Sequence, residues 1–456
     1  MAALTIRNIG AIVTCDDADL VLKSTTLRIE DGVIHSFGQP PQPADEVLDA
    51  RGGIVYPGLI NAHHHLYQTF SRNIPAVQNM ELFDWLKSLY GIWRHMDEEV
   101  VYYAALTGLA DLVRHGATTV SDHHYVFNEA GDGFMAALFA AADVLGVRLH
   151  ACRGSMSRGE SAGGLPPDSV VQSTDKILAD SADAVARFHD PAPLSFRQVV
   201  LAPCSPFSVT PELMRESAAL ARSLGVRLHT HLAETKDESA YVLAHEGMRP
   251  LAYMESLGWL GPDVWFAHGI HFDDAELVRL QNTGTGVAHC PASNMKLSSG
   301  ACRVRDMLEL GVPVGLAVDG SASNDGSNLL AEIRSGYLLH RLEQSERAPS
   351  AYDMLKLATR GSAALLGRAD MLGQLGIGRA ADLFILDVSG LDYVGTALDP
   401  KALPGAVGYV GPTLATVIGG RIVAADGRLT GIDEARLAEE ADAVWRRYMR
   451  RAGVSA

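Results

Sequence analysis

The chain has 456 residues, of which 47% are apolar and 20% are charged, a balance typical of globular proteins with a large core. Its 38 Lys and Arg residues are outnumbered by 54 Asp and Glu residues, so the formal net charge is −16. This balance argues against nucleic-acid binding, which needs clustered positive charge, and no apolar stretch approaches the roughly 18 residues of a membrane helix.

The N-terminal segment 1–7 lacks the charged-then-apolar pattern of a secretory signal peptide. The five cysteines are widely spaced and never form a C-x-x-C pair: Cys15, Cys152, Cys204, Cys290 and Cys302. This usage is typical of reduced thiols rather than of disulfides or a thiolate metal site. We therefore expect a cytoplasmic protein that binds neither nucleic acid nor membrane.

Short strands and tight turns fill both ends of the chain. Near the N-terminus the turn Asp31-Gly32 separates two short apolar runs, which predicts a β-hairpin, and Gly419-Gly420 does the same near the C-terminus. We expect residues 1–56 and 374–432 to form one small β-sandwich domain. The tail, residues 433–456, is expected to form an amphipathic surface helix.

Residues 57–373 alternate between helical stretches that end in glycine and short apolar strands. One example is the predicted helix 97–115, which Gly116 ends before the predicted strand 118–123. There are eight such strands, the first of which ends at His63, and this is the number that a (β/α)8 TIM barrel needs. A doubly wound open sheet is the alternative. We favour the barrel because polar residues stand at the carboxyl end of nearly every strand, where barrel enzymes place their chemistry.

Two long inserts interrupt this alternation, at residues 66–96 and 154–180. Loops of this length on the active face of a barrel are usually lids or pocket walls. The first insert carries four aromatic residues whose alternative role is packing beneath the loop: Phe83, Trp85, Tyr90 and Trp93.

The short motif His63-His64-His65 directly follows the apolar run 53–60, which reads as a buried strand. In an extended chain residues i and i+2 point the same way, so His63 and His65 face one side together. Two adjacent imidazoles make half of a divalent-metal site. Two ordinary histidines are an equally good interpretation of this motif alone.

Further polar residues stand at the predicted strand ends: His123, Arg153, His231, His268, His289 and Asp319. In a closed barrel the first and eighth strands are neighbours and the fifth lies across the mouth. His63 and His65 can therefore meet His231 and Asp319. Three imidazoles and a carboxylate suit one Zn²⁺, and Fe²⁺ or Mn²⁺ also fits this ligand set.

Glu234 lies three residues beyond His231 and is expected to reach the rim of the same site, although a carboxylate at a helix start is the alternative. With these residues the chain resembles the amidohydrolase superfamily, in its deaminase and aminohydrolase branch. Five segments carry the resemblance, in the family's order: Pro57–His65, His231–Glu234, Ala267–Gly269, His289–Asn294 and Val318–Gly320. The resemblance covers essentially the whole chain, including a returning β segment at residues 376–383.

The resemblance implies a single metal ion held by His63, His65, His231 and Asp319, since no counterpart of the lysine that bridges two metals is evident. It also implies hydrolytic deamination of an amino-substituted heterocycle. Asp319 would take the proton of an attacking water, and His268 would hold and polarise that water. Glu234 would protonate a ring nitrogen, and help of this kind typically contributes 10²–10⁴-fold.

For the substrate, the spacing of Gln68 after the His63-x-His65 pair resembles guanine deaminases, in which the glutamine contacts the purine. Arg153 is expected to bind a ring carbonyl, with a salt bridge to a neighbouring carboxylate as the alternative. We expect His123 to be a satisfied barrel-mouth histidine and leave the role of His289 open.

The 154–180 insert makes the chain look more like the group of bacterial 8-oxoguanine deaminases and hydroxyatrazine aminohydrolases. We therefore expect 8-oxoguanine as substrate, giving urate and ammonia, ahead of guanine or isocytosine-like rings and then triazines. Triazine chlorohydrolases, ring-opening amidases and a degenerate barrel that only binds ligands are the rival interpretations. We also expect a homo-oligomer.

Overall fold

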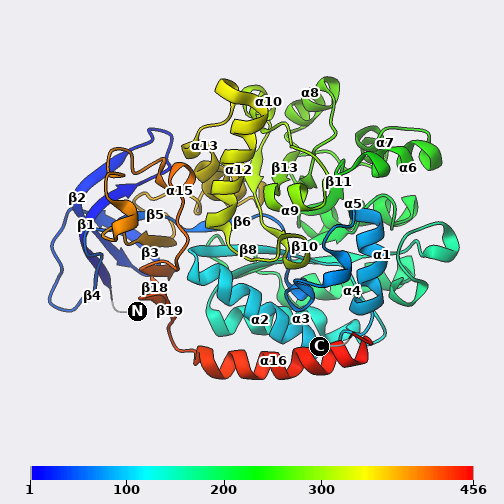
Figure 1. The fold of residues 1–456 in the computed structure, drawn as a ribbon, viewed down its shortest axis with the longest axis horizontal. Coiled ribbons are helices and arrows are strands. Elements are labelled where there is room, and N and C mark those ends of the chain that lie inside the picture. The colour runs from blue at the N-terminus through cyan, green and yellow to red at the C-terminus, as the bar shows by residue number, and fades with distance from the viewer. Residues whose placement is uncertain (1–2, 455–456) are drawn as a thin grey trace.

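The computed structural model describes residues 3–454. Eight parallel strands lie at the centre of the larger part of the molecule (Figure 1). They are β6 (Leu59–Asn61), β8 (Ala117–His124), β9 (Arg148–Ser155), β10 (Arg197–Pro203), β11 (Leu228–Leu232), β12 (Val264–His268), β13 (Gly286–His289) and β14 (Val314–Leu316), each bonded to the next. The Ala62 amide donates to the Leu316 carbonyl at 3.3 Å, which links the last strand to the first. The prediction of a TIM barrel is confirmed, and the open sheet is wrong.

A short extension continues this closure at the mouth of the barrel. There β7 (His64–His65) pairs in parallel with β15 (Asp319–Gly320), with Asp319 opposite His64. The Asp319 amide also donates to the His63 carbonyl at 3.2 Å. Segments from the first and eighth strands, some 255 residues apart, are therefore held side by side by backbone hydrogen bonds.

Helices surround the barrel and begin and end where the sequence supplies caps. Asp97 caps α2 by accepting from the Val100 amide, and Thr210 caps α5 ahead of a proline in its first turn. The helices are α1 (Leu82–Trp93), α2 (Glu98–Arg114), α3 (Phe134–Leu145), α4 (Thr174–Phe188), α5 (Pro211–Leu224), α6 (Lys236–Glu246), α7 (Pro250–Ser256), α8 (Asp274–Thr283), α9 (Pro291–Lys296), α10 (Val304–Leu310), α11 (Ser321–Asn324), α12 (Leu329–Gln344), α13 (Ala351–Lys356), α14 (Ser362–Leu365), α15 (Leu403–Ala406) and α16 (Glu434–Arg451).

Strands from both chain ends build a nine-stranded mixed sheet beside the barrel, seen at the left of Figure 1. Its members are β1 (Leu4–Val13), β2 (Val21–Glu30), β3 (Val33–Phe37), β4 (Glu46–Asp49), β5 (Ile54–Pro57), β16 (Leu383–Leu386), β17 (Ala415–Ile418), β18 (Arg421–Ala425) and β19 (Arg428–Leu429). The antiparallel pair β5–β16 joins the two halves. This sheet has its own apolar cluster, separate from the packing around the barrel.

Alternation along the strands sorts the barrel side chains into two groups. On β9, Leu149 and Ala151 pack into the layer between barrel and helices, whereas Cys152 packs inside the barrel with Val200 of β10. This alternation sets which side of the barrel wall each polar side chain reaches.

The C-terminal helix α16 lies along α2 at the edge of the molecule (Figure 1). The Trp445 indole donates to the Phe70 carbonyl at 3.0 Å, and the Tyr448 hydroxyl donates to the Ile92 carbonyl at 3.2 Å. Both bonds tie the tail to the first insert, next to the barrel mouth. Across residues 3–454, no helix combines the length and apolar character that crossing a bilayer requires.

Candidate metal centre and pocket

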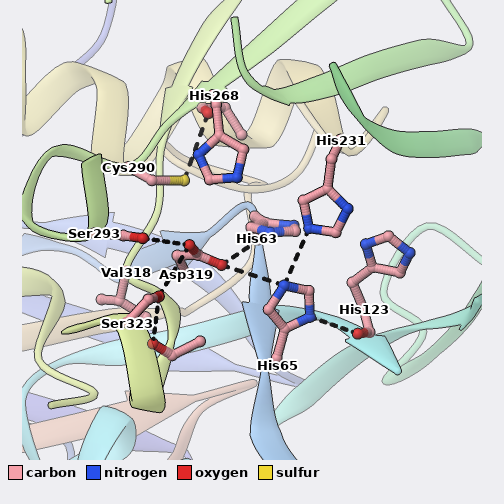
Figure 2. A network of polar contacts seen from close by, with 12 residues as sticks. His63, His65, His123, His231, His268, Cys290, Ser293, Val318, Asp319 and Ser323 are labelled. Atoms are coloured by element: carbon pink, nitrogen blue, oxygen red, sulfur yellow. Dashed lines mark hydrogen bonds and ion pairs between the residues drawn. The ribbon is translucent and has the colours of Figure 1, made fainter. Parts of the chain in front are cut away.

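Four side chains from distant parts of the sequence meet at the barrel mouth: His63, His65, His231 and Asp319 (Figure 2). The Nε2 atoms of His63 and His65 each lie 3.2 Å from the same Asp319 carboxylate oxygen. The Nε2 atoms of His65 and His231 are 3.1 Å apart. Every side chain is at least nine-tenths buried. The structure thus brings together the four residues that the sequence placed at one site.

Backbone carbonyls set the proton positions on two of these rings. Nδ1 of His65 donates to the His123 carbonyl at 2.6 Å, and Nδ1 of His231 donates to the Cys204 carbonyl at 2.7 Å. A neutral imidazole carries one proton, so both Nε2 atoms are left with lone pairs that face each other. Two lone pairs at this distance repel unless a cation lies between them.

His63 receives the same support through a second histidine. Its Nδ1 is 2.7 Å from Nε2 of His229, whose own Nδ1 donates to the Trp265 carbonyl at 2.9 Å. His229 Nε2 therefore accepts a hydrogen bond from His63 Nδ1–H and leaves the His63 Nε2 without a proton, and that buried atom has no hydrogen-bond partner. Burial holds the pKa values of His63 and His231 well below their usual range, so both rings are neutral, as metal ligands must be. The donor set fits a divalent cation.

Replacing His229 with leucine is expected to weaken metal binding about 10- to 100-fold, because His63 loses the acceptor that orients it. His229→Gln keeps an acceptor oxygen and should recover part of the affinity. Titration with a metal-sensitive chelator measures this without an activity assay. Equal affinity in the leucine and wild-type proteins would show that His229 does not position the ligand.

Asp319 is held by two serines as well as by its backbone. Ser293 Oγ and Ser323 Oγ donate to one carboxylate oxygen at 2.5 and 3.1 Å, which leaves the other oxygen facing His63 and His65 (Figure 2). The backbone of Asp319 is left-handed, with φ 61°. A non-glycine residue in this conformation costs about 1–3 kcal/mol and marks a position that the surrounding structure enforces.

His268 and Glu234 face the pocket next to this cluster, 3.4 Å apart. His268 ends β12 in a left-handed conformation, φ 73°, which turns its ring away from the outward side that Phe266 occupies. The Asn294 amide lies 2.9 Å from its Nδ1, and Ser299 Oγ donates to Glu234 at 3.3 Å. Burial lowers the pKa of His268 to about 4, whereas burial and the nearby Asp319 raise the pKa of Glu234 well above its usual range. The site therefore holds an imidazole of lowered pKa beside a carboxyl group of raised pKa.

The pocket beside the cluster is lined by both polar and apolar side chains. His65, His231, Glu234, His268 and Asp319 form its floor. Its walls come largely from the first insert, the loop after β8 and the loop after β10: Gln68, Leu82, Trp85, Leu86, Tyr125, Cys204 and Phe207. The prediction that the 66–96 insert walls the pocket is thus confirmed. The 154–180 insert contributes no lining residue, because it packs on α6 instead, where Arg158 pairs with Glu246 at 3.2 Å.

Gln68 lies within this pocket, as the sequence predicted. Its Oε1 is buried and has no hydrogen-bond partner. The side chain packs directly on the backbone of Gly320, where a Cβ atom would lie only 1.9 Å from Oε1. Glycine at position 320 therefore makes the space that this amide occupies.

Arg153 requires a correction. Its guanidinium lies over the Phe127 ring at 3.7 Å and donates to Asp180 at 3.1 Å and to Gln172 at 2.8 Å. It shares the strand parity of Leu149 and Ala151, so it points into the helix layer and not into the mouth. The predicted contact with a ring carbonyl is wrong, and the salt bridge that was the alternative is what the structure shows.

The two remaining strand-end histidines also bond elsewhere. His123 Nε2 donates to the Ala202 carbonyl at 2.7 Å, but its buried Nδ1 has no hydrogen-bond partner, so the expectation of a satisfied histidine holds for one ring nitrogen only. His123 also lies within reach of three of the cluster histidines. His289 Nε2 lies 3.2 Å from Nε2 of His340 on α12 and does not line the pocket.

Several supporting residues escaped the sequence reasoning: His229, Ser293, Asn294, Ser299 and Ser323. His229 was detectable, because it stands two residues before His231 and so faces the same side of a strand. Ser293 and Asn294 lie in one of the motifs that carried the resemblance, without an assigned role. Ser299 and Ser323 carry no local pattern, and only the fold brings them to Glu234 and Asp319.

Comparison with known proteins finds relatives that match nearly the whole chain, in sequence and in structure. The chain is 43% identical to hydroxydechloroatrazine ethylaminohydrolase of Pseudomonas sp. strain ADP, covering 96% of this chain and 94% of the relative. It is also 43% identical to 8-oxoguanine deaminase of Pseudomonas aeruginosa, covering 96% and 97%. The crystal structure of an atrazine chlorohydrolase from Arthrobacter aurescens TC1 in complex with zinc superposes with a TM-score of 0.92 at 32% identity, over 97% of this chain and 100% of that one. Residues 54–423 match the amidohydrolase family, and the chain belongs to that family.

Proposed function

We propose that this protein is a metal-dependent hydrolytic deaminase that converts 8-oxoguanine and water to urate and ammonia. The observation that carries the proposal is the pair Glu234 and His268, which lie 3.4 Å apart at the rim of the metal cluster and line the same pocket. An amine leaves a ring carbon poorly unless it receives a proton, and this pair can hold and deliver one.

Each residue has a defined task in this proposal. A bound divalent ion supplies a water whose pKa falls toward about 7. The free oxygen of Asp319 accepts the proton of the attacking water and later returns it to the departing amine. Glu234, whose pKa burial raises, donates a proton to the ring nitrogen beside the reacting carbon, and it regains a proton from the hydroxyl group of the adduct as the carbonyl forms. His268 Nε2 faces the pocket, where it holds the water against that carbon.

The pocket fits a flat, small heterocycle. Trp85, Tyr125 and Phe207 offer aromatic surface, and the leucines of α1 close one side. The two relatives named as acting on 8-oxoguanine and on hydroxydechloroatrazine support this class of ligand.

Zinc is the proposed ion. Three neutral imidazoles and a carboxylate form the ligand set of catalytic zinc sites, and Fe²⁺ or Mn²⁺ has affinity for the same donors. The zinc complex of the related atrazine chlorohydrolase supports the choice. Elemental analysis of the purified protein measures the identity and the stoichiometry, for which one ion per chain is expected.

The function is tested by the release of ammonia from 8-oxoguanine, guanine and isocytosine and of alkylamine from N-alkylamino triazines, at equal enzyme and substrate concentrations. We expect the highest kcat/KM with 8-oxoguanine. The triazine alternative, favoured by the equal identity to the ethylaminohydrolase, predicts that amine release from the hydroxylated triazine is faster instead. If no aminated ring in the panel releases ammonia or amine, the proposal fails.

Gln68→Leu tests the contact with the substrate. The unpartnered Oε1 of Gln68 suits a ring N–H donor, and the amide group can also donate to a carbonyl. Loss of this pair should raise KM for 8-oxoguanine about 10-fold or more, since a buried partner is left unmatched. Metal content should not change. Steady-state kinetics that show an unaltered KM would remove Gln68 from substrate recognition.

A further inference from the structure

A second cavity lies at the opposite end of the barrel from the metal cluster. It has a volume of about 340 Å³ and lies between the loop 189–193, the starts of β10 and β11, and residues 366–371 beyond α14. We call it the basal pocket. Its polar lining includes His150, His189, Arg227 and Arg368, none of which contributes to the site at the mouth.

The basal pocket presents buried polar atoms that nothing satisfies. Arg227 Nε, Arg368 Nη1 and His150 Nε2 are all shielded from solvent and have no hydrogen-bond partner in the described part of the chain. The side chains of His150 and Arg368 are more than nine-tenths buried. Buried donors without partners are rare and costly, so such a group points to a ligand that completes it.

The two arginines also lack direct ion pairs, although Asp263 lies near Arg227, and Asp190 and Asp382 lie near Arg368. The buried Arg148 pairs with Asp382 at 2.7 Å, whereas neither Arg227 nor Arg368 forms an ion pair with any carboxylate among residues 3–454. Arg368 is held by carbonyl oxygens, including that of Pro193 at 2.6 Å. A carbonyl satisfies a hydrogen bond but does not neutralise a buried charge.

His189 adds a hydrogen-bond donor to the basal pocket. His189 Nδ1 accepts from the Val199 amide at 3.1 Å, so the proton of its neutral ring is on Nε2. Burial and the charges of Arg368, Arg227 and His189 hold the pKa of His150 well below its usual range. The acidic residue in the lining is Asp370, which is solvent-exposed.

We propose that the basal pocket binds a small oxyanion, a phosphate or a carboxylate, between Arg227, Arg368 and the two histidines. An oxyanion offers several lone pairs to converging N–H donors and neutralises the guanidinium charges, whereas a water molecule accepts only two such bonds. In a chain of net charge −16, this local positive site is set apart from its surroundings. The proposal is independent of the reaction at the mouth.

Isothermal titration of the metal-loaded protein with inorganic phosphate, and separately with citrate, tests the proposal. We expect saturable one-to-one binding of at least one of the two, and the tighter one identifies phosphate or carboxylate as the class. Arg227→Gln and Arg368→Gln should each weaken that binding about 10-fold or more, because each removes a charge-assisted donor. Arg450→Gln removes the same charge from the exposed face of α16 and should leave binding unchanged.

The outcomes separate clearly. Absence of saturable binding of both anions to the wild-type protein would overturn the proposal and leave the cavity to water. Binding that neither substitution weakens would place the anion elsewhere, including at the metal, and would overturn it as well. If circular dichroism shows that Arg368→Gln unfolds because the 189–193 loop is released, the result with Arg227→Gln alone decides the test.

Discussion

The Glu234→Gln enzyme is expected to keep its metal ion and to lose about 10²- to 10⁴-fold in kcat, the range that a general acid typically contributes. Glutamine preserves the shape of the side chain and its contact with Ser299 but has no acidic proton to give. Stopped or continuous assays of ammonia release give kcat, and elemental analysis gives the metal content.

The pH dependence adds a second readout for the same residue. Burial raises the pKa of Glu234, so the carboxyl group keeps its proton to a higher pH than an exposed glutamate does and loses it as the pH rises through the raised pKa. In the wild-type enzyme kcat should therefore fall as pH rises through that raised pKa. This alkaline decline should be missing from the residual activity of Glu234→Gln.

Glu276→Gln provides a matched control. Glu276 is exactly as exposed as Glu234, at 4%, but it pairs with Arg249 on the outer helices. This variant should keep most of the wild-type kcat and an unchanged pH profile. A Glu234→Gln enzyme as active as this control would remove Glu234 from the acid role, whatever else the site contains.

The His231→Ala protein is expected to fold without its metal ion and to be inactive. In the wild-type structure the Nε2 atom of His231 lies 3.1 Å from that of His65, and removing the His231 ring opens this side of the cluster. Loss of a ligand should exceed the roughly 100-fold loss of affinity that follows from removing a supporting residue. Elemental analysis after dialysis measures the retained metal.

His289→Ala is the control for this experiment. His289 is also a buried histidine at the carboxyl end of a barrel strand, but it bonds to His340 and does not line the pocket. It should retain about one metal ion per chain. A His231→Ala protein with the same metal content as His289→Ala would exclude His231 from the ligand set and would undermine the proposed site as a whole.

The sequence determined those features that depend on local pattern. Glycine and capping residues such as Thr210 and Gly225 marked where helices end, and the apolar alternation predicted eight parallel strands. The i, i+2 spacing of His63 and His65 predicted a shared face, and their Nε2 atoms reach the same oxygen of Asp319. Such patterns are readable because strand and helix periods act over a few residues.

Only the tertiary structure decided on which side of the barrel wall a side chain lies and which distant residues it contacts. Arg153 ended a strand as expected, yet its parity sends it to Asp180 in the helix layer. His268 also stands at a strand end, but its left-handed backbone turns the side chain toward the pocket, and no sequence pattern predicted this conformation. The proton positions on His63 depend on His229, 166 residues away along the chain. Such a hydrogen bond depends on the closed barrel, because only the folded chain brings residues so distant in sequence within 3 Å of each other.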